Sequence, residues 1–249
     1  YGFWAFVVAE IVLGIGQSFV SGADSAMLYD TLKVSGEEKQ YIKEEGRIIS
    51  AGNFSEAVAG VCGGLIAAVS LRLPFYFQFG IAATAIPAAL LLKEPRFHTR
   101  EVAHSFTSIF GTIRQTFLHP EMRSALLVSS LAGTASLTFA WFVQPYFLGA
   151  GLPVSMFGIM WTVLNLSVGL SSIFSYKAED LLGPRNSLLI IILGLSACYF
   201  LAAWKISIAG ITILFAFYLL RGIAHPLLKD YLNQYTRSEV RATVLSLRD

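Results

Sequence analysis

The sequence predicts an all-α protein, a polytopic bundle of transmembrane helices, from three observations. Of the 249 residues, 55% are hydrophobic and 14% are charged, whereas soluble domains carry about 25% charged residues. Seven apolar segments come close to or exceed the roughly 20 residues that a helix needs to cross a bilayer core of about 30 Å. Positive charges fall almost entirely on alternate connections between these segments. The composition excludes a soluble domain, and a net charge of +2 gives no support for nucleic-acid binding.

Turn residues such as Pro74, Gly183 and Lys205 separate the predicted spans, and an eighth helical pattern opens near residue 238. The chain begins at Tyr1 within an apolar run, so we expect an internal fragment of a longer membrane protein. The predicted spans cover residues 3–30, 46–71, 74–92, 123–149, 155–176, 187–204 and 207–232.

The distribution of Lys and Arg predicts the orientation of these spans. Of the 18 Lys and Arg residues, only Arg72 and Lys205 lie on one side of the predicted membrane. The others lie in loops and helix ends on the opposite side. Because positively charged loops stay in the cytoplasm, we predict a multi-pass membrane protein whose basic loops are cytoplasmic.

The longest connection, residues 93–122, divides the chain. We predict the remainder of one helical half in residues 1–92, a cytoplasmic linker in 93–122 and a second half in 123–249. Apolar residues at helical spacing predict an amphipathic helix within the linker, without a binding partner of its own. These residues are Val102, Phe106, Ile109, Phe110, Ile113 and Phe117. Two helical halves joined in this way are typical of a transporter.

The span 46–71 carries small residues at every fourth position. Ala51, Ser55, Ala59 and Gly63 form one ridge, and Gly52, Glu56, Gly60 and Gly64 form a second ridge beside it. Small ridges allow a neighbouring helix to approach closely in lipid. Glu56 interrupts its ridge with an acid, which is expensive in a membrane unless it is paired, protonated or wet.

The first predicted span has a polar stripe on one helical face. Such a stripe faces a wet cavity or another polar helix. Substrate and proton contacts are compatible with this pattern, and so is a hydrogen-bonded seam between helices. The stripe consists of Glu10, Gly14, Gln17, Ser21 and Asp24.

Two further spans carry polar candidates. In the seventh span, Arg221 and His225 lie on one helical face, and His225 can exchange a proton near neutral pH. In the fourth span, Trp141 and Gln144 could contact an amphipathic substrate, although Trp near a helix end is also an interfacial anchor. In the fifth span, Asn165 is expected to bond a neighbouring helix.

No enzyme motif, metal-binding spacing or nucleotide-binding loop occurs in the sequence. Cys62 and Cys198 both lie in apolar runs and are expected to behave as small hydrophobic residues. We therefore predict no enzymatic activity, no cofactor, no metal, and neither nucleotide nor nucleic acid as a partner.

Four stretches resemble the major facilitator superfamily of secondary transporters. They are Ser21–Asp30 followed by Gly46 and Arg47, the loop Tyr176–Arg185 with Asp180, Gly183 and Arg185, the stretch Arg221–Asn233, and Arg241–Ser246. The resemblance covers the whole chain, from the fourth transmembrane helix of that family to the start of the eleventh. It implies two six-helix halves, here truncated, in a bacterial protein.

The resemblance also implies where the functional residues lie. Spans 3–30, 123–149 and 207–232 would line the central cavity, with Glu10 or Asp24 as the proton carrier. Span 46–71 would contact span 155–176, with Glu56 bonded to Asn165. The implied cavity residues are Glu10, Gln17, Asp24, Trp141, Gln144, Arg221 and His225, and the implied packing and gating residues are Gly46, Gly60, Gly63 and Gly64.

These expectations predict a secondary active transporter in the bacterial inner membrane that works by alternating access. Its partners would be a small-molecule substrate, protons and the lipid bilayer. The glycine pattern of span 46–71 resembles drug–proton antiporters, which favours efflux. An uptake symporter or facilitator for a sugar, peptide or metabolite is one alternative, and a membrane sensor or lipid-modifying enzyme on the same scaffold is another.

Overall fold

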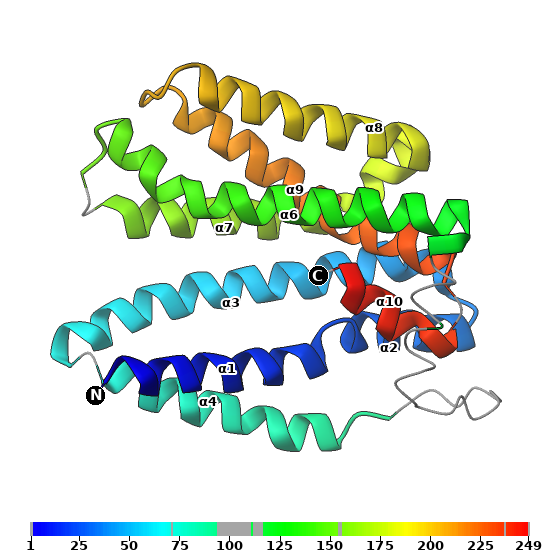
Figure 1. Ribbon diagram of the computed structural model, residues 1–249, viewed down its shortest axis with the longest axis horizontal. Helices are drawn as coiled ribbons and strands as arrows, with labels where there is room; N and C mark the ends of the chain where they lie inside the picture. The colour runs from blue at the N-terminus through cyan, green and yellow to red at the C-terminus, as the bar shows by residue number, and fades with distance from the viewer. Residues whose placement is uncertain are drawn as a thin grey trace. The chain divides into compact units, whose positions relative to one another are not determined.

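The computed structural model describes residues 2–70, 72–93, 111, 117–153, 156–236 and 238–248. Within these residues the protein is helical and has no strand (Figure 1), which confirms the predicted fold class. Most of the predicted amphipathic helix in the linker lies outside the described residues. The helices are α1 (Phe3–Val20), α2 (Ala23–Val34), η1 (Glu38–Gln40), α3 (Tyr41–Val69), α4 (Leu73–Leu90), α6 (Pro120–Gly149), α7 (Phe157–Ile173), α8 (Ser175–Trp204), α9 (Ile211–Gln234), η3 (Ser238–Val240) and α10 (Arg241–Arg248).

Length and composition allow five of the described segments to cross a membrane. They are Phe3–Val34, Leu73–Leu90, Met122–Gly149, Ser175–Trp204 and Ile211–Gln234, and α7 is a shorter apolar helix. Helix α4 has no buried residue, and Phe75 and Phe79 on it are 71% and 77% exposed. Contiguous exposed apolar surface of this kind is rare on a soluble protein and is the expected surface of a helix in lipid.

The prediction of one continuous helix over residues 3–30 is wrong. Helix α1 ends at Val20, and α2 begins at Ala23 after Gly22, whose φ is +75°. A Cβ atom on Gly22 would meet the backbone of Ala242 and Ser246, so this position requires glycine for its conformation and for its contact. The five-residue polar stripe is therefore interrupted, because Glu10 and Asp24 lie on different helices.

The loop signature around Gly183 is mostly helical. Helix α8 continues from Ser175 to Trp204 with a break at Gly183, whose φ is +74°. Pro184 follows the break, at the start of the second segment, where proline is well tolerated in a helix. The predicted span 187–204 thus begins earlier than expected, directly after the turn.

Contacts divide the chain into two compact units. Unit 1 comprises Tyr1–Tyr41, Pro95–Thr138 and Leu227–Asp249, and unit 2 comprises Ile42–Glu94 and Phe139–Pro226. Each unit combines segments from both sides of residues 93–122.

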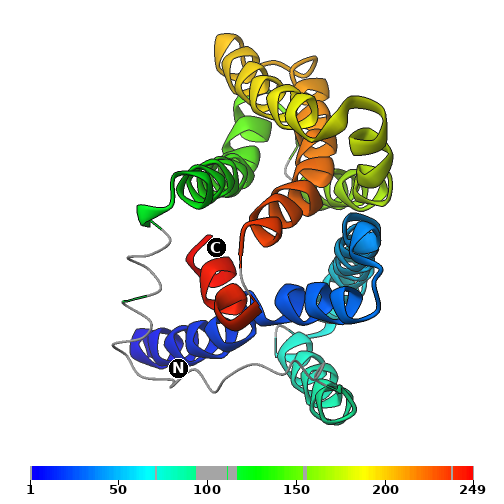
Figure 2. The ribbon, with the colours of Figure 1, turned by 90° about the vertical axis from the view of Figure 1, so that its right-hand side faces the viewer.

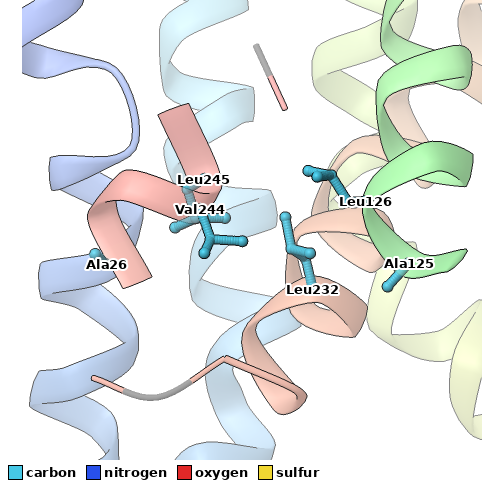
Figure 3. Packing of buried hydrophobic residues seen from close by; sticks show 6 residues of the cluster. All are labelled: Ala26, Ala125, Leu126, Leu232, Val244 and Leu245. Carbon is cyan, nitrogen blue, oxygen red and sulfur yellow. The ribbon is translucent and has the colours of Figure 1, made fainter. Parts of the chain in front are cut away.

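The core of unit 1 joins α2, α6, α9 and α10. Figures 1 and 2 both show α10 beside α2, and Figure 3 shows the apolar side chains that meet between them and their neighbours. Leu232 and Val244 are completely buried in this core. The cluster consists of Ala26, Ala125, Leu126, Leu232, Val244 and Leu245.

In unit 2, α7 packs closely on α3. A Cβ atom on Gly46 would overlap the carbonyl oxygen of Ser172, and the Ser172 hydroxyl donates a hydrogen bond of 3.0 Å to the carbonyl of Gly46. Further along, Gly169 lies against Asn53 and Ser50. Glycine at these positions brings two helices close to backbone contact, which is how helices associate in lipid.

Helix α9 packs on the same part of α7. A Cβ atom on Gly222 would meet the Ser171 hydroxyl and the Val168 carbonyl. The contact of α3 with α7 that the resemblance implies is therefore present, but not through the predicted ridges. The contact uses Gly46, Ser50 and Asn53, whereas Gly60 and Gly63 have no described atom within 4 Å of an added Cβ. Gly64 is described only as part of the helix backbone.

These contacts predict opposite effects of alanine at two glycines of α3. Gly46→Ala should destabilise the protein by about 1–3 kcal/mol, because the new methyl group overlaps a backbone carbonyl. Gly60→Ala should be neutral or stabilise by up to about 1 kcal/mol, because alanine favours the helix. Thermal unfolding of the purified protein in detergent measures both, and equal melting temperatures for the two variants would contradict the packing.

Candidate functional site

A buried ion pair joins α2 and α10 in unit 1. Arg241 Nη1 contacts Asp30 Oδ1, and the two side chains are only 1% and 14% exposed. Arg241 Nη1 also donates to Ser238 Oγ at 3.0 Å, and Nη2 donates to the carbonyl of Thr236 at 2.7 Å. A guanidinium can satisfy several acceptors in this way because its donors form a planar fork.

Aromatic rings cover the face of the same guanidinium. The Arg241 carbon Cζ lies 4.3 Å from the centroid of the Tyr29 ring, a cation–π arrangement. Tyr29 in turn meets the Tyr41 ring edge to face, with centroids 5.1 Å apart. Arg241 is therefore held by charge, by hydrogen bonds and by stacking at once.

Three further hydrogen bonds connect α2, and Ser21 just before it, to α9, to η3 and to α10. Lys229 Nζ donates to Ser25 Oγ at 2.7 Å, Ser238 Oγ donates to Asp30 at 2.9 Å, and Ser246 Oγ donates to the carbonyl of Ser21 at 2.5 Å. We call these contacts together with the Asp30–Arg241 pair the α2 clamp. Segments more than 200 residues apart in the chain meet in it.

A second polar cluster lies in unit 2, on the membrane-crossing part of α9. The Tyr218 side chain is completely buried, and the Arg221 guanidinium lies 5.6 Å from the centroid of its ring. Trp161 on α7 faces the same ring from another side, with centroids 6.5 Å apart. Arg221 and Glu56 both lie close enough to the Tyr218 hydroxyl to interact with it electrostatically, and Arg221 is in a position to donate to it.

The register of the helices explains why Glu56 belongs to this cluster. On α3, Gly46 lies against Ser172 and Asn53 lies against Gly169, so α3 and α7 are antiparallel. One further turn of α3 brings Glu56 to the level of Asn165.

The contacts of α9 with α7 bring part of α9 to the same depth as Glu56. Gly222 lies against Val168, and Tyr218 lies against Trp161, so α9 and α7 are parallel. Arg221 therefore lies between the levels of Trp161 and Val168 on α7, close to the depth of Glu56.

Unit 2 also contains a partly open apolar cavity of about 350 Å³ between α6, α8 and α9. Phe139, Tyr146, Tyr199 and Leu214 are among the residues that line it, and none of the described lining residues is charged. Phe139 stacks on Phe217 with ring centroids 3.8 Å apart. The cavity can hold apolar groups, but it offers no charge for ion coupling.

The predicted cavity residues do not form a single cluster in the described part of the chain. Arg221 and His225 are partly buried on α9, and Asp24 accepts a hydrogen bond from the backbone N–H of Ser25. The Asn165 amide donates to the carbonyl of Trp161 on its own helix, in place of the expected bond to Glu56. The exposed residues of the predicted set are Glu10, Gln17, Asp24, Glu56, Trp141, Gln144, Asp180 and Arg185.

Sequence reasoning missed the roles of Asp30 and Arg241. Both lie in stretches that carry the family resemblance, and they have opposite charges beside apolar helical segments. That signal marks each residue as a candidate for burial, but nothing in the sequence pairs two residues that lie 211 positions apart.

Loss of charge in the clamp should destabilise the protein strongly. Asp30→Asn leaves the buried guanidinium of Arg241 without its counter-ion, so we expect a loss of about 3–5 kcal/mol. Glu44→Gln removes the exposed pair Glu44–Arg47, in which the side chains are 29% and 57% exposed, so it should cost at most about 1 kcal/mol. Chemical unfolding in detergent measures both, and a similar loss for both variants would show that burial of the Asp30 pair contributes nothing.

The chain was compared with protein families, curated proteins and solved structures. Neither the curated proteins nor the solved structures gave a match. The family model of the Major Facilitator Superfamily matches residues 1–248, almost the whole chain. The match agrees with the helical fold and with the apolar membrane-spanning segments. The chain belongs to the major facilitator superfamily and is a multi-pass membrane transporter of small molecules.

Proposed function

We propose that the protein is a proton-coupled secondary transporter that works by alternating access, with its basic loops in the cytoplasm of a bacterium. The observation that supports this most directly is the α2 clamp. Alternating access requires contacts that close one end of the substrate pathway in one state and break in the other. The clamp consists of an ion pair and hydrogen bonds, which are either made or broken.

The energetics of the clamp fit such a switch. A buried ion pair adds little net stability, because desolvation of both charges offsets their attraction. The closed state therefore need not be much more stable than an open state in which water solvates Asp30 and Arg241. An apolar contact of the same size would favour closure more strongly.

The clamp also joins the two proposed halves. Helix α2 belongs to residues 1–92 and α10 to residues 123–249, the segments that we expect on either side of the linker. If these segments move relative to one another during transport, Asp30 and Arg241 must separate. The positive charges around them support a position of the clamp at the cytoplasmic end.

We propose Glu10 and Asp24 as proton carriers, because an acid within a membrane span is a functional candidate. Efflux by antiport is the favoured direction, on the resemblance of Gly46, Gly60 and Gly63 to the glycine pattern of antiporters. Uptake by symport is the second candidate, since Ser55 and Ala59 occupy positions where the antiporters carry glycine.

The accessibility of Ala26, which is buried beside α10 and is not part of the clamp, tests this function without a known substrate. After replacement of Cys62 and Cys198, a single cysteine at Ala26 is labelled with an impermeant maleimide in inside-out vesicles. Asp30→Asn should raise the labelling rate by at least about 10-fold, because the clamp opens. A pH gradient should change the rate in the parent protein, and Glu10→Gln combined with Asp24→Asn should abolish that response.

Glu44→Gln is the matched control, because it removes an exposed ion pair and should leave the labelling rate unchanged. A rate that responds neither to Asp30→Asn nor to the pH gradient would contradict a gate at the α2 clamp. A response to the gradient that survives loss of both acids would contradict Glu10 and Asp24 as carriers.

A further inference from the structure

The polar cluster on α9 contains more hydrogen-bond donors than acceptors. The Arg221 guanidinium and the Trp161 indole N–H can only donate. The Tyr218 hydroxyl can do both, and it is completely buried. Among the described residues, Arg221 is the polar side chain that faces this hydroxyl, at the margin of hydrogen-bond geometry. Because Arg221 can only donate, the hydroxyl hydrogen still lacks an acceptor, and we expect a bound molecule to supply one.

Arg221 also needs an acceptor for its hydrogen-bond donors. It lies within a membrane-spanning helix, and its guanidinium can only donate hydrogen bonds. In the part of the chain that the structure describes, no carboxylate lies within ion-pair distance of it. Because Arg221 is only partly buried, a ligand can reach its free donors.

Glu56 limits the charge that the cluster can accept. The helix register puts its carboxylate near the depth of Arg221, and the described contacts include no direct ion pair between the two. One negative charge on a ligand can pair with Arg221. A second would be repelled by Glu56, because like charges interact strongly in a medium of low polarity.

We propose that Arg221, Tyr218 and Trp161 recognise the substrate, and that the substrate is an organic monoanion with a planar apolar body. Its carboxylate accepts hydrogen bonds from Arg221 and from the Tyr218 hydroxyl, a geometry for which arginine is well suited. Its apolar body lies against the Trp161 ring. Glu56 selects against a second negative charge.

This inference rests on the proposed transport function and names the substrate class for it. The test is calorimetric titration of the full-length protein in detergent with 1-naphthoate, the neutral 1-naphthamide and the cationic 1-naphthylmethylammonium. Naphthoate should bind at least about 10-fold more tightly than the other two, because a charged hydrogen bond contributes about 1.5–3 kcal/mol.

Three variants test the role of individual residues in naphthoate binding. Arg221→Gln should weaken naphthoate binding by about 10- to 100-fold, and Tyr218→Phe by a smaller factor of about 3- to 10-fold, since each removes a donor. Glu56→Gln should tighten binding by about 3- to 10-fold, because it removes a repulsive charge. Arg123→Lys and Glu37→Gln are matched controls at exposed positions and should not change the affinity.

Three results would overturn the inference: tighter binding of the cation, no binding of naphthoate, or unchanged affinity in both Arg221→Gln and Tyr218→Phe. Weaker binding in Glu56→Gln would instead make Glu56 a direct ligand and contradict its selective role. The cysteine labelling at Ala26 needs no substrate. If that labelling responds to the clamp and to the pH gradient while naphthoate does not bind, only the substrate assignment fails.

Discussion

The pairing of Arg241 with Asp30 is the interaction on which unit 1 depends. One guanidinium holds α2 through Asp30, the segment just after α9 through the Thr236 carbonyl, and η3 through Ser238. Such a buried charge is tolerated only when it is paired, so these segments are constrained together. Gly22 permits the approach of α10, because a side chain there would meet its backbone.

In unit 2, close contacts at glycine residues hold the helices together. Gly46, Gly169 and Gly222 let α3 and α9 approach α7 closely. Close backbone contact fixes the register of these helices, which in turn brings Glu56, Trp161 and Arg221 to a similar depth. The packing of apolar helices therefore determines which polar side chains lie at the same depth.

Much of the fold follows from the sequence, because hydropathy and positive charge in loops depend only on local composition. The break at Gly22 was missed since helical periodicity continues through it, and only the contact with α10 explains the turn. The small residues Gly60 and Gly63 do lie at helical spacing, as expected for a packing ridge. However, no described residue packs against them. Asp30 and Arg241 could not be paired without the tertiary structure, whereas Arg221 stood out as a charge within a span.

The central claim is that the α2 clamp opens and closes. The most direct test is the distance between spin labels at Val34 on α2 and Leu247 on α10, both of which are exposed, measured in lipid nanodiscs by pulsed electron resonance. The account predicts two distance populations whose ratio depends on pH, with the longer distance dominant in Asp30→Asn. A single short distance under all conditions, unchanged in Asp30→Asn, would show that the clamp is a permanent structural contact and contradict the account.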